Sequence, residues 1–215
     1  MRQFWTGISG TAVSNLTSNA NYPDLPTGSQ FLLRLEGPTS WGTNYGTRIR
    51  GYLHPTATGD YTFWIAGDDT AELWLSTDAN PANAVKIAYV SAYTDPRQWD
   101  KYAQQQSVTI PLVAGRKYYL DVLHKQGTGG DNIAVAWQGP GLDQQVIDGK
   151  YLSPWTGALG GDTEGDNLVN MLDISDMAAD WLQTDCDMTL ELDVNGDCII
   201  NFTDFAIAAL NWATM

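Results

Sequence analysis

The chain has 215 residues and a formal net charge of −14, and that charge is unevenly distributed. Residues 151–215 hold twelve Asp or Glu and no Lys, Arg or His, so they carry −12 of the total. An anionic segment repels the phosphate backbone and argues against nucleic acid as a partner, whereas it suits divalent cations. No run of eighteen apolar residues is present, which argues against a membrane-spanning helix.

The region from about residue 30 to residue 138 reads as short apolar runs separated by turn residues. Segments 61–65 and 72–75 alternate apolar and polar residues, which is the period of a half-buried strand. Many short strands without a helical period between them predict an antiparallel β-sandwich or barrel. The expected strands are 31–35, 47–54, 61–66, 71–76, 85–90, 107–112, 117–125 and 133–137.

A compositional boundary follows this mainly β region. Pro and Gly are concentrated where the charge changes, which predicts a linker over 153–160 between a β domain at 1–152 and a small domain at 161–215. The small domain is an internal repeat with an offset of 31 residues, and each half ends in an expected helix, at 174–182 and 205–212. Neither half buries its apolar face alone, so we expect the halves to pack together.

Each repeat places oxygen-bearing side chains at positions 1, 3, 5, 9 and 12 of a twelve-residue loop, with the backbone carbonyl available at position 7. Calcium takes six to eight oxygen ligands, and this spacing wraps them around one ion. A solvated acidic surface would have no reason to repeat in register. The expected ligands are Asp162, Glu164, Asp166, Leu168, Asn170 and Asp173 in the first loop, and Asp193, Asn195, Asp197, Ile199, Asn201 and Asp204 in the second.

The Asn at position 9 and the Asp at position 12, in place of a long Glu, resemble the type I dockerin pattern. The resemblance covers residues 161–215 and implies two EF-hand-like calcium loops with a cohesin domain as partner. Position 6, usually Gly, is Asn167 or Cys198, and positions 10 and 11 lack the paired hydroxyl residues of the best-known type I dockerins. Cys186 and Cys198 either form a disulfide, which fits an oxidising compartment, or remain two buried thiols.

In the β domain, Asp68 and Asp69 lie between two expected strands, where adjacent carboxylates either repel each other in solvent or share a cation. A Gly-rich segment, 126–132, follows a later strand. This combination resembles the domain first named from anthrax protective antigen, also found in yeast flocculins and in bacterial adhesins and glycosidases. In its lectin members the Asp pair and a second loop hold a calcium ion that chelates two sugar hydroxyls.

The resemblance spans residues 4–152 and implies one further calcium ion here. It assigns sugar and calcium binding to Asp68, Asp69 and Asp131, with Gln126 and Asn132 as additional candidates. A plain turn is the alternative for the Asp pair. Tyr93, Trp99 and Tyr45 are candidates for stacking on a sugar, although core or rim positions are the commoner use of such aromatic residues.

Catalytic signatures are absent from the sequence. The two histidines, His54 and His124, lie on expected strands and read as structural, and no Ser-His-Asp order, phosphate loop or Cys/His metal cluster is present. Residues 1–5 lack the apolar stretch of a signal peptide. We therefore expect a secreted or cell-surface, non-enzymatic, calcium-dependent carbohydrate-binding module whose signal peptide is absent from this chain. The alternative is a structural spacer whose calcium loops only stabilise the C-terminus.

Overall fold

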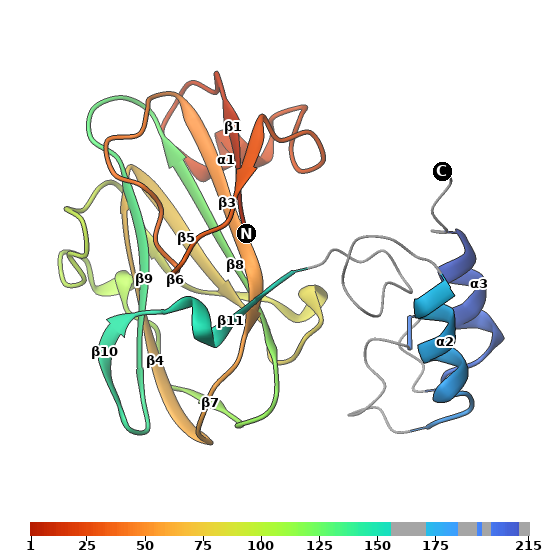
Figure 1. Cartoon of the computed structure of the whole chain (residues 1–215). Coiled ribbons are helices and arrows are strands. Elements are labelled where there is room, and N and C mark those ends of the chain that lie inside the picture. The colour runs from red at the N-terminus through yellow and green to blue at the C-terminus, as the bar shows by residue number, and fades with distance from the viewer. Residues whose placement is uncertain (156–170, 185–192, 195–198, 211–215) are drawn as a thin grey trace. The chain divides into compact units, whose positions relative to one another are not determined.

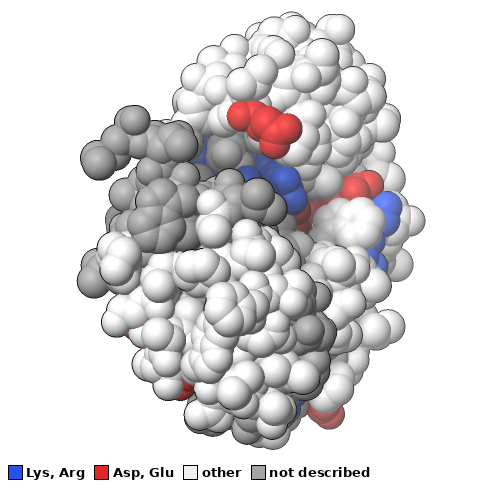
Figure 2. Space-filling model, turned by 90° about the vertical axis from the view of Figure 1, so that its right-hand side faces the viewer, with Lys and Arg blue, Asp and Glu red and all other residues white. Residues whose placement is uncertain are grey.

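The computed structural model describes residues 1–155, 171–184, 193–194 and 199–210 (Figure 1). The chain divides into two compact units, Met1–Pro154 and Trp155–Met215, which are described separately below. None of the described helices is long and apolar enough to cross a membrane. Among the described residues in view in Figure 2, Lys, Arg, Asp and Glu side chains are few.

The first unit consists of two antiparallel β-sheets (Figure 1). The larger sheet has the order β2-β1-β3-β8-β5-β6, with β11 also paired to β3, and the smaller has the order β10-β9-β4-β7. The larger sheet is built from β1 (Arg2–Thr6), β2 (Gly28–Gln30), β3 (Tyr45–Leu53), β5 (Thr70–Leu75), β6 (Val85–Val90), β8 (Tyr118–Gln126) and β11 (Leu152–Pro154). The smaller is built from β4 (Gly59–Asp68), β7 (Ile110–Leu112), β9 (Asn132–Gly139) and β10 (Leu142–Val146).

Four short helices lie among these strands: α1 (Val13–Thr17), η1 (Pro81–Asn83), η2 (Ala103–Gln105) and η3 (Gly149–Tyr151).

The core lies between the two sheets, and both supply it with alternate residues of their strands. Ile49 and Val122 of the larger sheet belong to the same buried cluster as Phe63, Val135 and Trp137 of the smaller one. Full burial of side chains of this size contributes about 1.5–3 kcal/mol each. The alternating apolar pattern therefore specifies a β-sandwich, as the sequence predicted.

The expected strand at 31–35 is wrong. This segment makes only an isolated bridge, between Arg34 and Asp148, and Phe31 and Leu33 are exposed while Leu35 is buried. Its apolar residues thus do not share one covered face, which a paired strand needs. The sequence also missed β1, β2, β10 and β11, and Ser153 and Pro154 lie in β11 although the expected linker began there.

In the second unit, α2 (Met171–Ala179) and α3 (Phe202–Leu210) each begin three residues before the expected helices. The start of α3 is fixed by Asn201, whose Oδ1 accepts the Thr203 N–H at 2.7 Å while its own N–H donates to Asp204 Oδ2 at 2.9 Å. This is the reciprocal arrangement of a capping box. Met177, Ile200 and Ala208 form a small core, so α2 and α3 pack together as the repeat predicted.

Candidate functional site

The acidic pair lies where the chain crosses from one sheet to the other. β4 ends at Asp68 in the smaller sheet and β5 begins at Thr70 in the larger, with Asp69 between them, and the Asp68–Asp69 peptide bond is cis. The connection from β8 to β9, residues 127–131, makes the same crossing in the opposite direction. Asp68 is opposite Asn132, so the topology brings the two connections together.

Glycines allow this close approach. The Gly127 N–H donates to Asp69 Oδ2 at 2.8 Å, and a Cβ added at Gly127 would lie 3.2 Å from that oxygen. A Cβ added at Gly130 would lie 3.3 Å from Asp68 Oδ2. The Gly-rich segment therefore borders the carboxylate pair, as the resemblance implied, because its backbone fits where side chains would crowd the acids.

Two buried amide side chains beside the pair use only their nitrogen. Gln126 donates its Nε2 to the Gly130 carbonyl at 2.7 Å, and Asn132 donates its Nδ2 to the Thr94 carbonyl at 2.8 Å. Gln126 Oε1 and Asn132 Oδ1 are both buried, and no described group donates a hydrogen bond to either. A buried acceptor without a donor costs about 1–3 kcal/mol, so such oxygens are natural cation ligands.

This donor set fits calcium, which prefers carboxylate, amide and main-chain oxygens. No group of three or more acidic, His or Cys side chains that could hold a metal occurs among the described residues. A cation here would therefore be held by Asp68 and Asp69 together with amide and main-chain oxygens.

Asp131 has a different environment from the one the resemblance implied. Its side chain is only 4% exposed. The Trp41 N–H donates to both of its oxygens at 2.9 Å, and Oδ2 also accepts the Gly42 N–H at 2.8 Å and the Tyr45 hydroxyl at 3.0 Å. These contacts weigh against a ligand role, because the carboxylate is already engaged in holding the 41–45 segment against the Gly-rich loop.

The charges around the pair are unbalanced. Burial, then repulsion from Asp69 and from Asp131, raises the pKa of Asp68 to about 6. The charged form of Asp68 is thus disfavoured in the protein alone, and a bound cation would offset that cost.

Two buried basic residues near the acidic pair donate hydrogen bonds to main-chain carbonyls. The sequence assigned neither of them to the site. The fully buried His124 donates its Nε2–H to the Asp68 carbonyl at 2.6 Å, and burial lowers its pKa to about 4. The buried Lys125 donates its ammonium to the carbonyls of Gly10 and Gln126, at 2.6 Å each. Burial lowers the Lys125 pKa, while nearby Asp69 raises it. The feature that could have identified them is that two adjacent basic residues, His124 and Lys125, lie in β8, a strand that is buried along its whole length.

The three aromatic candidates separate in the structure. Tyr45 is 2% exposed and packs in the interior, so the stacking role considered for it is wrong. Tyr93 is 53% exposed and forms an isolated bridge with Asp68, which places it beside the pair. Its ring centre lies 3.3 Å from the Lys101 ammonium nitrogen. Trp99 lines a hollow of the surface together with Trp64, and neither Asp68 nor Asp69 lines that hollow.

The second of the two expected calcium loops of the tail is described in part. The buried Asp204 accepts the Asn201 N–H, and Asn201 Nδ2 donates to the Ile199 carbonyl at 3.0 Å, so positions 7, 9 and 12 lie together. Asp193 is also described, whereas Asp173 is placed only as a position in α2. The remaining expected ligands and both cysteines lie outside the described residues: Asp162, Glu164, Asp166, Leu168, Asn170, Asn195, Asp197, Cys186 and Cys198.

Residues 34–150 match the family model of the PA14 domain. The chain therefore belongs to the PA14 domain family, in agreement with the two-sheet fold and with the resemblance in sequence. Among curated relatives, N-acetyl-beta-glucosaminyl-glycoprotein 4-beta-N-acetylgalactosaminyltransferase 1 of Mus musculus is 38% identical over 154 residues, covering 68% of this chain and 15% of the transferase. Fibrocystin of Canis lupus familiaris is 31% identical over 115 residues, covering 49% of this chain and 3% of fibrocystin. The chain thus spans only a small part of these relatives.

Solved structures are similar to this chain at low sequence identity. An anti-sigma factor domain-containing protein aligns with a TM-score of 0.51 and 16% identity, over 73% of this chain and 48% of that chain. The Epithelial Adhesin 6 A domain from Candida glabrata, solved in complex with Galb1-3GlcNAc, aligns with a TM-score of 0.48 and 12% identity, over 70% of this chain and 84% of that chain. At such identities the likeness concerns the fold alone.

Proposed function

We propose that the β domain is a calcium-dependent carbohydrate-binding module of a secreted or cell-surface protein. One observation carries this proposal: Asn132 is opposite Asp68 and Gln126 precedes Gly127, which bonds to Asp69, and the buried amide oxygens of Gln126 and Asn132 accept no hydrogen bond from the described residues. Membership of the PA14 family supports it, because another PA14 domain, from an RTX adhesin, is named as sugar-binding.

Each residue of the proposed site has a separate role in binding the cation or the sugar. Asp68 and Asp69 supply negative charge at the surface, and the amide oxygens of Gln126 and Asn132 supply neutral ligand atoms. A bound calcium ion would offer two coordination positions to vicinal hydroxyls of a sugar in place of water. The exposed ring of Tyr93 beside Asp68 supplies an apolar face on which a sugar ring can pack. His124 holds the Asp68 backbone, so the pair is in place before the ligand arrives.

Binding to a glycan array in calcium and in EDTA tests this proposal. We expect Asp69→Ala to abolish glycan retention, because it removes charge and geometry from a site with few protein ligands. Asp60→Ala is the matched control, since Asp60 is an exposed acid at the other end of β4. Retention that persists both in Asp69→Ala and in EDTA would place the ligand elsewhere. If the unaltered protein retained no glycan in calcium, the structural-spacer alternative would be favoured.

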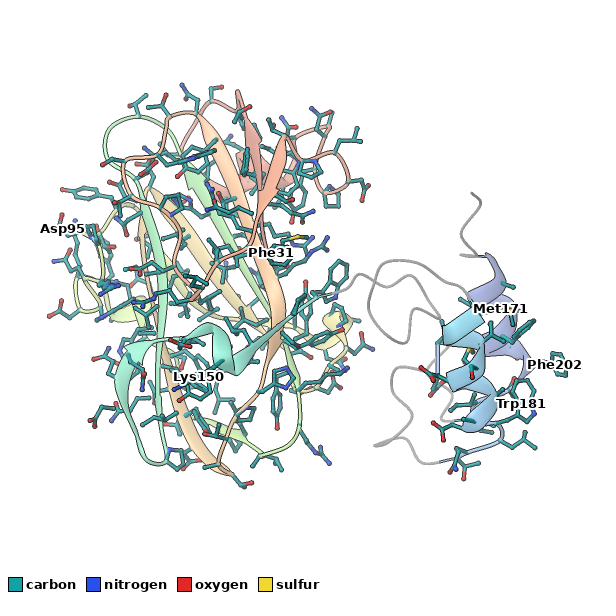
Figure 3. All side chains as sticks on the ribbon, viewed as in Figure 1. Phe31, Asp95, Lys150, Met171, Trp181 and Phe202 are labelled. Carbon is teal, nitrogen blue, oxygen red and sulfur yellow. The ribbon has the colours of Figure 1, made fainter. Side chains whose placement is uncertain are left out.

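For the tail we propose a dockerin-like module that binds two calcium ions and docks to a cohesin domain. The repeat and the contacts among Ile199, Asn201 and Asp204 support this. Phe202 at loop position 10 is 75% exposed, and its ring meets that of Trp181 edge-on at 5.2 Å (Figure 3). An exposed aromatic pair of this kind suits a protein interface.

Gel filtration with purified type I and type II cohesin domains tests the docking proposal. We expect a complex in calcium that EDTA dissociates and that Phe202→Ser weakens about tenfold or more. Val85→Ser is the control, because Val85 is an exposed apolar residue in the other unit. If no cohesin forms a complex, the calcium loops serve only the stability of the C-terminal unit.

A further inference from the structure

A hollow opens on the outer face of the smaller sheet, and neither Asp68 nor Asp69 lines it. Its volume is about 440 Å³, within the range of small-molecule sites. We call it the Trp64–Trp99 hollow. Its lining combines three aromatic side chains with three amides: Trp64, Trp99, Tyr102, Gln98, Gln106 and Gln144.

The strands position the floor of the hollow. Phe63 and Ile65 point into the core, so Trp64 between them points outward from β4. Its neighbour on β9 is Ala136, which in turn is opposite Val146 of β10. The small side chain of Ala136 therefore lies between Trp64 and β10 on the outer face of the sheet.

The wall of the hollow is the connection between β6 and β7, residues 91–109, which also carries Asp95 (Figure 3). Gln105 anchors this wall from a fully buried position. Its Nε2 donates to the carbonyls of Ile65 at 2.9 Å and Gln98 at 2.6 Å, and its Oε1 accepts the Tyr102 N–H at 2.8 Å. The hollow is therefore preformed, which reduces the entropy lost on binding.

The charge in the hollow is nearly balanced. Arg97 is committed to Glu36, because its Nε and one terminal nitrogen each donate to that carboxylate at 2.7 Å. Asp100 is the other charged residue of the lining. With its cation already paired, the hollow offers no free positive charge to an anionic ligand.

We propose that the Trp64–Trp99 hollow binds a neutral pyranose residue of a glycan chain without a metal ion. The apolar C–H face of a pyranose can pack on an indole ring, and its hydroxyls can both donate to and accept from amide side chains. The side chains of Gln106 and Gln144 make no hydrogen bond within the described part of the chain, so both are free for such hydroxyls. This site goes beyond the calcium site and does not depend on it.

The test is titration of the full chain in EDTA with neutral hexaoses: cellohexaose, xylohexaose, mannohexaose and chitohexaose. Two-dimensional ¹H–¹⁵N NMR reports the indole N–H signals of Trp64 and Trp99, assigned by substitution. We expect at least one hexaose to shift both signals, and Trp99→Ala or Gln144→Ala to weaken its binding at least about tenfold. Both residues lie outside the core, in a connection and an edge strand, so these variants should remain folded.

Two controls separate this site from the calcium site. Tyr89→Ala removes an exposed aromatic residue outside the hollow and should leave binding unchanged. Asp69→Ala should also leave it unchanged, even if that variant abolishes calcium-dependent retention. The proposal is overturned if no neutral hexaose shifts the two signals, if Trp99→Ala binds as tightly as the unaltered chain, or if an oligogalacturonate binds better than every neutral hexaose.

Discussion

Replacing Asp131 by alanine would show whether this carboxylate belongs to the fold or to a metal site. Its oxygens accept the N–H groups of Trp41 and Gly42 and the hydroxyl of Tyr45. Hydrogen bonds to a charged group contribute about 1.5–3 kcal/mol each. Trp41 is 38% exposed, so its main-chain N–H can bond to water instead, whereas Tyr45 is buried. We therefore expect Asp131→Ala to lower the free energy of unfolding of the first unit by about 3–5 kcal/mol, less than the full sum.

Urea denaturation in EDTA, followed by near-ultraviolet circular dichroism, measures this loss. Asp131→Asn keeps one acceptor oxygen and should lose about half as much. If Asp131 were mainly a calcium ligand, Asp131→Ala would destabilise the protein in calcium and leave its stability in EDTA nearly unchanged. A change of less than about 0.5 kcal/mol in EDTA would thus refute the structural role.

Three further outcomes follow from the structure. Burial lowers the pKa of His124 to about 4, below the usual 6.5, so the folded state favours the neutral ring. The stability that His124 contributes is therefore complete above pH 6.5. About 3 kcal/mol of it is lost as the pH falls to 4. Urea denaturation at pH 7 and pH 4.5 should show a smaller acid loss in His124→Gln, and an equal loss would contradict this. Gly139→Ala should lower stability by about 1–3 kcal/mol in thermal denaturation, because its Cβ would lie 2.3 Å from the Tyr61 ring. Gly42→Ala is the control and should be near neutral, because its Cβ would meet only an ordinary 3.9 Å contact. A fragment of residues 155–215 should lose helical circular dichroism in EDTA, because metal binding contributes folding energy to so small a unit, and an unchanged spectrum would count against the calcium loops.

Local sequence pattern determined much of this protein. Strands β3, β4, β5, β6 and β8 were expected from short apolar runs between turn residues. In β4 and β5 the apolar residues also alternate, and that two-residue period is a property of the strand itself. The place of Asp68 and Asp69 at a strand end and the Gly-rich segment after β8 were equally visible, as was the tail repeat. Edge strands such as β2 and β10 were not, because what defines them is the partner strand they meet.

Only the tertiary structure decided which polar groups of the Gly-rich segment are already hydrogen-bonded. The sequence favoured Asp131 over Gln126 as a calcium ligand. Asp131, however, meets Trp41 and Gly42, 90 and 89 residues away, while the oxygen of Gln126 meets no described donor. In the same way Trp64 and Trp99 share one hollow because the β6–β7 connection folds over β4. Whether a side chain is already hydrogen-bonded depends on groups that folding brings together from distant positions. Such contacts cannot be predicted from the neighbouring residues in the sequence.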